Sequence, residues 1–88
     1  MTTTIDQMRE RLSALAPQII QIDDDSALHA GHAGARTGGG HYRLKIVSPQ
    51  FADKVTMARH RLVYDALGSL MQHEIHALSI TAKTPEEV

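Results

Sequence analysis

The sequence predicts an α+β fold with two layers, in which helices cover one face of a three-stranded mixed sheet. Three short runs rich in β-branched residues alternate with helical stretches in the order α-β-β-α-α-β. The last run follows a helical crossover, so its strand is expected to join the sheet parallel to the second strand. A chain of 88 residues can form one modest core, and residues 1–88 are therefore interpreted as a single domain.

The first helix is predicted over residues 4–15. Thr4 followed three positions later by Gln7 is a capping-box pattern, which satisfies backbone N–H groups at a helix start. Pro17 cannot continue the helix and ends it. A β-rich run over residues 19–23 then predicts the first strand. The apolar face of the helix consists of Ile5, Met8, Leu12 and Leu15.

Residues 25–39 are predicted to form a long loop, because they contain many small residues and no periodic apolar pattern. A loop of this length in a compact domain is usually functional or disordered, and we expect residues 26–39 to be mobile without a partner. The second strand is predicted over residues 41–47, where apolar and polar residues alternate. Tyr42, Leu44 and Ile46 face one way, and His41, Arg43 and Lys45 face the other.

Helical periodicity returns over residues 54–72, and Gly68 favours a break into two helices because glycine weakens a helix interior. Met57 is expected in the core together with the adjacent apolar stripe. This predicted stripe consists of Val55, Ala58, Leu62, Val63, Ala66, Leu67, Leu70 and Met71.

The third strand is predicted over residues 75–81, with His76, Leu78 and Ile80 on one face. Thr84 and the proline after it have the pattern of a helix start. Too few residues follow this pair to form more than a short turn.

Composition narrows the classes of function. The net charge is −1 with histidine neutral, which is not typical of a protein that coats nucleic acid or an anionic membrane. The start of the chain lacks signal-peptide features, and no apolar run approaches the roughly 20 residues of a membrane helix. A cytoplasmic protein without a membrane partner is therefore expected. Six histidines and no cysteine direct attention to imidazole chemistry.

Two of the histidines stand out as candidate metal ligands. The ends of the second and third strands can bring the long loop, with His32, near His76 at the start of the third strand. Two imidazoles suit Zn, Cu, Fe or Ni, but they are too few for a closed structural zinc site, which takes four ligands. The pattern favours half of a site that another molecule completes. His29 and His41 are secondary ligand candidates, although a surface position for each is the simpler interpretation.

A basic stretch offers a different activity. Lys54, Arg59, His60 and Arg61 form a candidate nucleic-acid contact on the second helix, with a solvated basic patch as the simpler alternative. No nucleophile, base and oxyanion site is recognisable, so the sequence favours a binding protein over an enzyme.

The residues that follow Lys54 carry a family resemblance. Arg59-His60-Arg61-Leu62-Val63-Tyr64-Asp65-Ala66-Leu67, Ile75-His76-Ala77-Leu78-Ser79-Ile80 and Thr84-Pro85-Glu86 resemble the signature of the BolA family. Upstream, Gly40-His41-Tyr42-Arg43-Leu44 and Val47-Ser48 resemble the family's second strand. His32 stands nine residues before His41, where members with a histidine loop carry their loop histidine. The resemblance covers nearly the whole chain.

The resemblance implies a fold similar to a class II KH domain, although the GXXG loop of classical KH binding is missing at Gly68. It implies pairing with a monothiol glutaredoxin and a shared [2Fe-2S] cluster for cluster trafficking, maturation or iron and redox sensing. The glutaredoxin's cysteine and glutathione would bind one side, and His76 and His32 the other. The alternative that it implies is a DNA-binding transcriptional regulator of morphology or stress response. A weak homodimer of the isolated chain is a further alternative.

Overall fold

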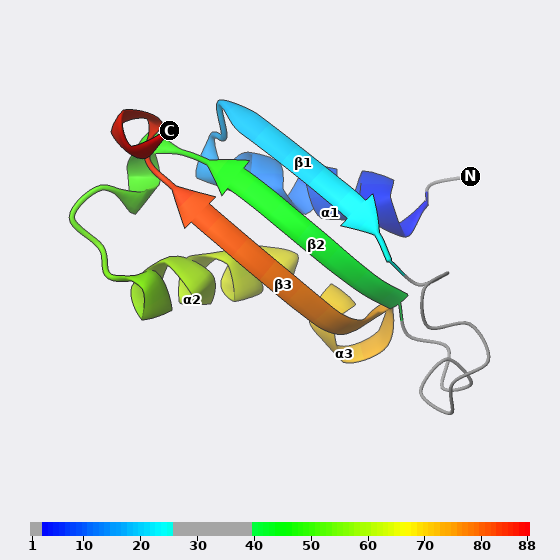
Figure 1. Cartoon of the computed structure of the whole chain (residues 1–88). Helices are drawn as coiled ribbons and strands as arrows, with labels where there is room; N and C mark the ends of the chain where they lie inside the picture. The colour runs from blue at the N-terminus through cyan, green and yellow to red at the C-terminus, as the bar shows by residue number, and fades with distance from the viewer. Residues whose placement is uncertain (1–2, 26–39) are drawn as a thin grey trace.

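The computed structural model describes residues 3–25 and 40–88, and the predicted loop mobility lies outside these residues. The order α-β-β-α-α-β and the three-stranded mixed sheet are confirmed. Strand β2 lies in the centre, antiparallel to β1 and parallel to β3, as the helical crossover predicts. The helices lie on one face of the sheet (Figure 1). The elements are α1 (Thr4–Leu12), β1 (Ile19–Asp24), β2 (Gly40–Val47), α2 (Thr56–Leu67), α3 (Leu70–His73) and β3 (Ile75–Lys83), with 3₁₀ turns at Ser13–Leu15, Pro49–Phe51 and Pro85–Glu87.

The start of α1 is capped one residue earlier than predicted. The Thr3 hydroxyl accepts from the Asp6 backbone N–H at 3.0 Å, and the Asp6 carboxylate accepts from the Thr3 N–H at 3.3 Å. This pair displaces the expected box at Thr4 and Gln7 because the Asp6 charge also favours the positive end of the helix dipole. The helix then tightens into a 3₁₀ turn before Ala16, whose positive φ of 48° turns the chain towards β1.

The inner face of the sheet is the predicted one. Tyr42, Leu44 and Ile46 are buried against the helices, whereas Arg43 and Lys45 are exposed on the opposite, open face of the sheet. Burying these apolar side chains is the main favourable contribution to folding. The buried partners from the rest of the chain are Met8, Leu12, Leu15, Ile22, Phe51, Val63, Leu67, Leu70 and Ile75.

Helix α2 starts later than predicted and buries a narrower face. Gly68 ends it at a φ of 55°, as its glycine suggested, but Val55 and Met57 are 73% and 72% exposed. Val55 precedes the helix as its N-cap residue. At about 100° per residue, Met57 stands about 180° around the helix from Ala66 on the core side. The expectation that Val55 and Met57 belong to the core is therefore wrong.

Strand β3 contains a bulge that the alternation of residues did not reveal. Gly40 pairs with Ile75 and His41 pairs with Ala77, so His76 is an extra residue between these pairs. The bulge resets the alternation: Ile75 is buried, Leu78 is half-buried, and His76 is exposed. The predicted common face of His76 and Leu78 is therefore wrong.

Candidate metal-binding site at the start of strands β2 and β3

Two histidines meet at one end of the sheet. Because β2 and β3 are parallel, His41 and His76 both lie where their strands begin, beside the point where the chain leaves β1 (Figure 1). Their ring centroids are 5.2 Å apart and their planes are tilted by 46°. The chain thus brings together two imidazoles that are far apart in the sequence.

Backbone hydrogen bonds fix the ends of the strands around this pair. The Asp25 N–H donates to the His41 carbonyl at 2.7 Å, and the Gly40 N–H donates to the Glu74 carbonyl at 3.0 Å. The bulge at His76 then adds a residue to one strand only, which re-aims a side chain near the end of the strand. Both residues are therefore attached at the paired starts of β2 and β3, with His76 at the bulge.

A hollow of about 360 Å³ lies beside His41, and His76 is not part of its lining. Arg43 Nε lies 2.6 Å from Asp25 Oδ2, so the one carboxylate in its lining is already paired with a cation. His41 contributes an imidazole to this lining, and imidazole suits Fe, Zn, Cu or Ni better than the hard ions Mg²⁺ and Ca²⁺. The lining residues are Asp25, His41, Tyr42, Arg43, Ala77, Leu78 and Ser79.

The spacing of the two rings fits one metal ion. Imidazole–metal bonds of about 2.0–2.1 Å at a tetrahedral angle place two ring centroids roughly 5 Å apart. The observed 5.2 Å agrees with that separation. Within residues 3–25 and 40–88 there is no group of three or more metal-binding side chains. His41 and His76 are therefore two candidate ligands, and a metal site here would need further ligands.

The histidines singled out in the sequence fall into three groups. His29 and His32 lie outside the described residues. His41 and His76 lie together at this site. His60 lies on α2, away from the starts of the strands, and His73 is exposed on α3. Sequence reasoning gave His41 a low rank as a ligand, because its strand position suggested a solvated side chain. Its place at the start of β2 was the signal that could have put it beside the start of β3.

The residues of the basic stretch differ in their contacts and exposure. Arg59 makes a two-contact ion pair with Glu87, at 2.6 and 3.1 Å, and its side chain is only 13% exposed. It also donates to the carbonyls of Lys54 at 2.8 Å and Ala82 at 3.1 Å. Arg59 therefore joins α2 to the C-terminal turn, whereas Lys54 and Arg61 are exposed.

This ion pair shifts the pKa values of both groups. The hydrogen bond to Arg59 and that from the Thr84 backbone lower the pKa of Glu87 to about 2. The hydrogen bond to Glu87 raises the pKa of Arg59. Both groups thus stay charged across the physiological range.

No helix among residues 3–25 and 40–88 is long and apolar enough to cross a membrane.

Comparison with known protein families gives a match over most of the chain. The family model described as BolA-like protein matches residues 12–87. The chain is 44% identical to SufE-like protein 1, chloroplastic/mitochondrial, of Arabidopsis thaliana, with 93% of this chain and 24% of the relative covered. It is 39% identical to BolA-like protein 1 of Mus musculus, covering 84% and 52%. The chain spans about half or less of these two relatives. UV-induced protein uvi31 of Schizosaccharomyces pombe is 42% identical, with 94% and 87% covered.

Solved structures agree with the sequence match. BolA1 from Arabidopsis thaliana superposes with a TM-score of 0.84 at 37% identity, covering 100% of this chain and 99% of the other. The BolA domain of SufE1 from the same plant gives 0.80 at 44% identity, covering 93% and 92%. The solution structure of BolA1 from Mus musculus gives 0.80 at 34% identity, covering 99% and 69%.

Proposed function

The chain belongs to the BolA-like protein family, and we propose that it is a binding partner that shares a [2Fe-2S] cluster with a monothiol glutaredoxin and glutathione. The observation that carries the proposal is the pairing of His41 and His76 at the start of parallel strands. Cluster trafficking, maturation or sensing would then depend on a protein complex, and the chain itself acts as a ligand donor and not as an enzyme.

The donor set fits one side of such a cluster. His76 is exposed at a bulge, so its ring is accessible to a second molecule. The family resemblance assigns the second imidazole to His32, and His41 lies beside His76 as the alternative. A bound cluster supplies reversible one-electron chemistry and transferable iron and sulfide. Imidazole in place of thiolate raises its reduction potential, as in Rieske centres.

The missing thiolates support a shared site. The chain has no cysteine, so the sulfur ligands of a cluster would come from the glutaredoxin and glutathione. Each iron of a [2Fe-2S] cluster needs two protein or thiol ligands besides the bridging sulfides. Two imidazoles therefore match one iron, and the partner would supply the other two ligands.

Location is part of the same proposal. We retain the cytoplasm as the proposed location. Two relatives from Arabidopsis thaliana are named for other compartments: SufE-like protein 1, chloroplastic/mitochondrial, and protein BOLA1, chloroplastic.

DNA-binding regulation remains the second candidate, favoured by the exposed cations Lys54 and Arg61 beside His60. Arg59 supports it less, since its guanidinium is engaged by Glu87. Phosphate contacts give a steep dependence of affinity on salt. Binding to a promoter fragment that weakens with salt and with Lys54→Ala plus Arg61→Ala would support this function, and no binding at low salt would exclude it.

Anaerobic reconstitution tests the cluster proposal. The chain is mixed with a monothiol glutaredoxin, glutathione, iron and sulfide, and visible circular dichroism and electron paramagnetic resonance are recorded. We expect spectra that differ from those of the glutaredoxin homodimer and that revert with His76→Ala. His73→Ala, at an exposed histidine on α3, is the control and should change nothing.

Comparing His41→Ala with His32→Ala identifies the second ligand, because the ligand variant alone should remove the mixed-ligand spectrum. Spectra that stay identical to those of the glutaredoxin homodimer with the unmodified chain would exclude the shared cluster.

A further inference from the structure

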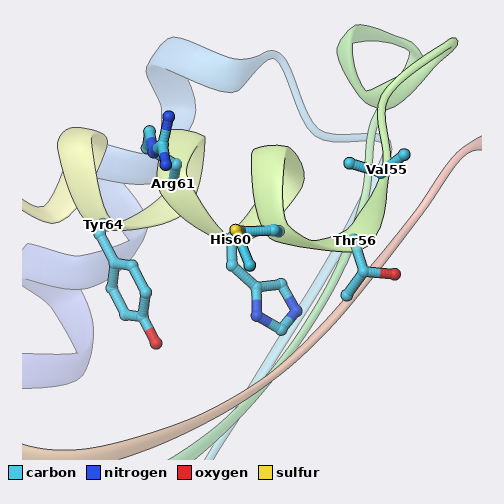
Figure 2. Close-up of a pocket in the computed structure, with 6 residues that line it drawn as sticks. Val55, Thr56, His60, Arg61 and Tyr64 are labelled. Atoms are coloured by element: carbon cyan, nitrogen blue, oxygen red, sulfur yellow. The ribbon is translucent and has the colours of Figure 1, made fainter.

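An open groove lies along helix α2. It has a volume of about 780 Å³. Figure 2 shows the His60 imidazole and the Tyr64 phenol projecting from the same side of the helix, with Val55 and Thr56 at its start. Spacings of three, four and seven residues place side chains on one face of a helix. The lining residues are Val55, Thr56, Met57, His60, Arg61 and Tyr64.

The groove gathers apolar side chains that the core does not use. Val55 is 73% exposed, Met57 72% and Tyr64 42%. They are three of the five large hydrophobic residues that are exposed in the described part of the chain. Scattered exposed hydrophobic residues are ordinary, but a contiguous group beside polar residues is typical of a protein interaction surface. Met and Tyr are also favoured in such surfaces.

The charge at this groove has one sign. Its lining includes Arg61 and His60 and contains no carboxylate. The first turn of α2 has no acidic residue, and the N-cap residue Val55 makes no side-chain hydrogen bond to it. By contrast, the first turn of α1 is capped by Thr3 and carries Asp6. The positive end of the α2 dipole therefore lies beside the groove, and no acidic residue of its first turn offsets it.

We propose that this groove binds a segment of a partner protein in which apolar side chains alternate with carboxylates along one helical face. The apolar side chains would pack on Met57 and Tyr64, and the carboxylates would meet Arg61 and the α2 N-terminus. Laying the apolar face of an amphipathic helix in a groove is a common way to recognise peptides.

The same observations disfavour other occupants. Nucleic acid would gain little from the exposed apolar side chains of Val55 and Met57, and Arg59 is held by Glu87. A second copy of the chain would bring its own Arg61 and the same positive helix end to the contact, and like charges oppose association.

The groove and the paired histidines lie at different ends of the molecule. Arg59 in the first half of α2 donates to the Ala82 carbonyl near the end of β3, at 3.1 Å. His76 is at the beginning of β3, and a strand rises about 3.3 Å per residue, so roughly 20 Å separate the two positions along it. The groove can therefore be occupied while His76 faces another molecule, and this proposal does not depend on the shared cluster.

Nuclear magnetic resonance titration of the full chain tests the proposal. Three synthetic helical peptides with one apolar pattern carry Glu, Gln or Lys at their charged positions. We expect the Glu peptide to shift the amides of residues 56–58, the Met57 methyl group and the Tyr64 ring, and the Lys peptide to leave them unchanged. Arg61→Glu should weaken the Glu peptide by roughly tenfold, because attraction becomes repulsion. Lys45→Glu, an exposed cation on the open face, and His76→Ala should bind like the unmodified chain.

Tyr64→Ala provides a second variant, which should weaken binding of the Glu peptide by removing an apolar side chain from the groove. Several results would overturn the proposal: no shifts at these residues with the Glu peptide, equal binding of the Lys peptide, or no effect of Arg61→Glu. Tighter binding of a DNA duplex to the same residues would assign the groove to nucleic acid. Shifts that depend on protein concentration without peptide would assign it to a second copy.

Discussion

Arg59 and Glu87 form a two-contact ion pair that fastens the C-terminal turn to helix α2. Nη1 and Nη2 of Arg59 lie 2.6 and 3.1 Å from the two carboxylate oxygens of Glu87. One of those oxygens also accepts from the Thr84 N–H at 2.7 Å. This parallel arrangement uses the planar guanidinium, and such bidentate pairs are stronger than single-contact pairs. A pair at the surface nevertheless contributes only modestly to stability.

The ion pair predicts a loss of stability in acid. The pKa of Glu87 is lowered from 4.5 to about 2, so the folded state favours its ionised form. The stabilisation is complete above the unfolded pKa near 4.5 and is lost as the pH falls towards 2. Thermal unfolding of the chain and of Glu87→Gln across this range checks it. The difference in melting temperature should shrink from pH 6 to pH 2, and a constant difference would contradict the assignment.

Substituting Arg59 should be more harmful than substituting Glu87. Arg59→Lys keeps the charge but loses the fork that reaches Glu87 and the backbone carbonyls of Lys54 and Ala82 together. We expect a lower melting temperature for Arg59→Lys than for Glu87→Gln at pH 7. The matched control is Arg61→Lys at the neighbouring exposed arginine, which should unfold like the unmodified chain. Equal melting temperatures for Arg59→Lys and Arg61→Lys would show that the contacts of Arg59 do not stabilise the fold.

Ser48 is a buried polar residue that stabilises the fold through two hydrogen bonds. Its hydroxyl donates to the Leu15 carbonyl at 2.5 Å and accepts from the Gln50 N–H at 3.1 Å. Ser48→Ala leaves both backbone groups without this partner, which we expect to cost about 1–3 kcal/mol of unfolding free energy. Urea denaturation measures the change. Ser69→Ala, at an exposed serine with no capping hydrogen bond, should have little effect.

Gly40 is required because the Tyr42 ring occupies the place of a side chain. A Cβ atom at Gly40 would lie 2.4 Å from the Cε2 atom of Tyr42, which is itself 8% exposed. Gly40→Ala should therefore displace a packed ring and cost about 1–3 kcal/mol. A double-mutant cycle with Tyr42→Leu checks the cause, because removal of the ring should relieve much of the penalty. Fully additive losses would show that the ring is not responsible.

The sequence predicted the sheet and its inner face well because these depend on short-range patterns. Alternation in β2 fixed the burial of Leu44 and the exposure of Lys45. The parallel partner of β2 followed from the helical crossover, which leaves few topologies. The meeting of the starts of β2 and β3 was therefore predictable, and it placed His76 correctly at that end of the sheet.

What sequence reasoning missed depends on contacts between distant residues. The bulge at His76 follows from pairing with β2, which no local pattern encodes. The partnership of Arg59 with Glu87 brings together α2 and the C-terminal turn. Met57 was misassigned because Val55 and Met57 extend the apolar run of α2 beyond the face that packs on the sheet. The residues of the groove were visible in the sequence, but their exposure was not.

The parallel pairing of β2 and β3 also sets an order of events during synthesis. His41 leaves the ribosome early, but its neighbour His76 belongs to the last strand. The ring pair cannot form until both helices between the strands have been made and β3 has docked. Because domains generally fold as units, a growing or truncated chain without β3 lacks His76 and therefore the ring pair. The contact between these two rings is thus a property of the finished fold and of no shorter part of the chain.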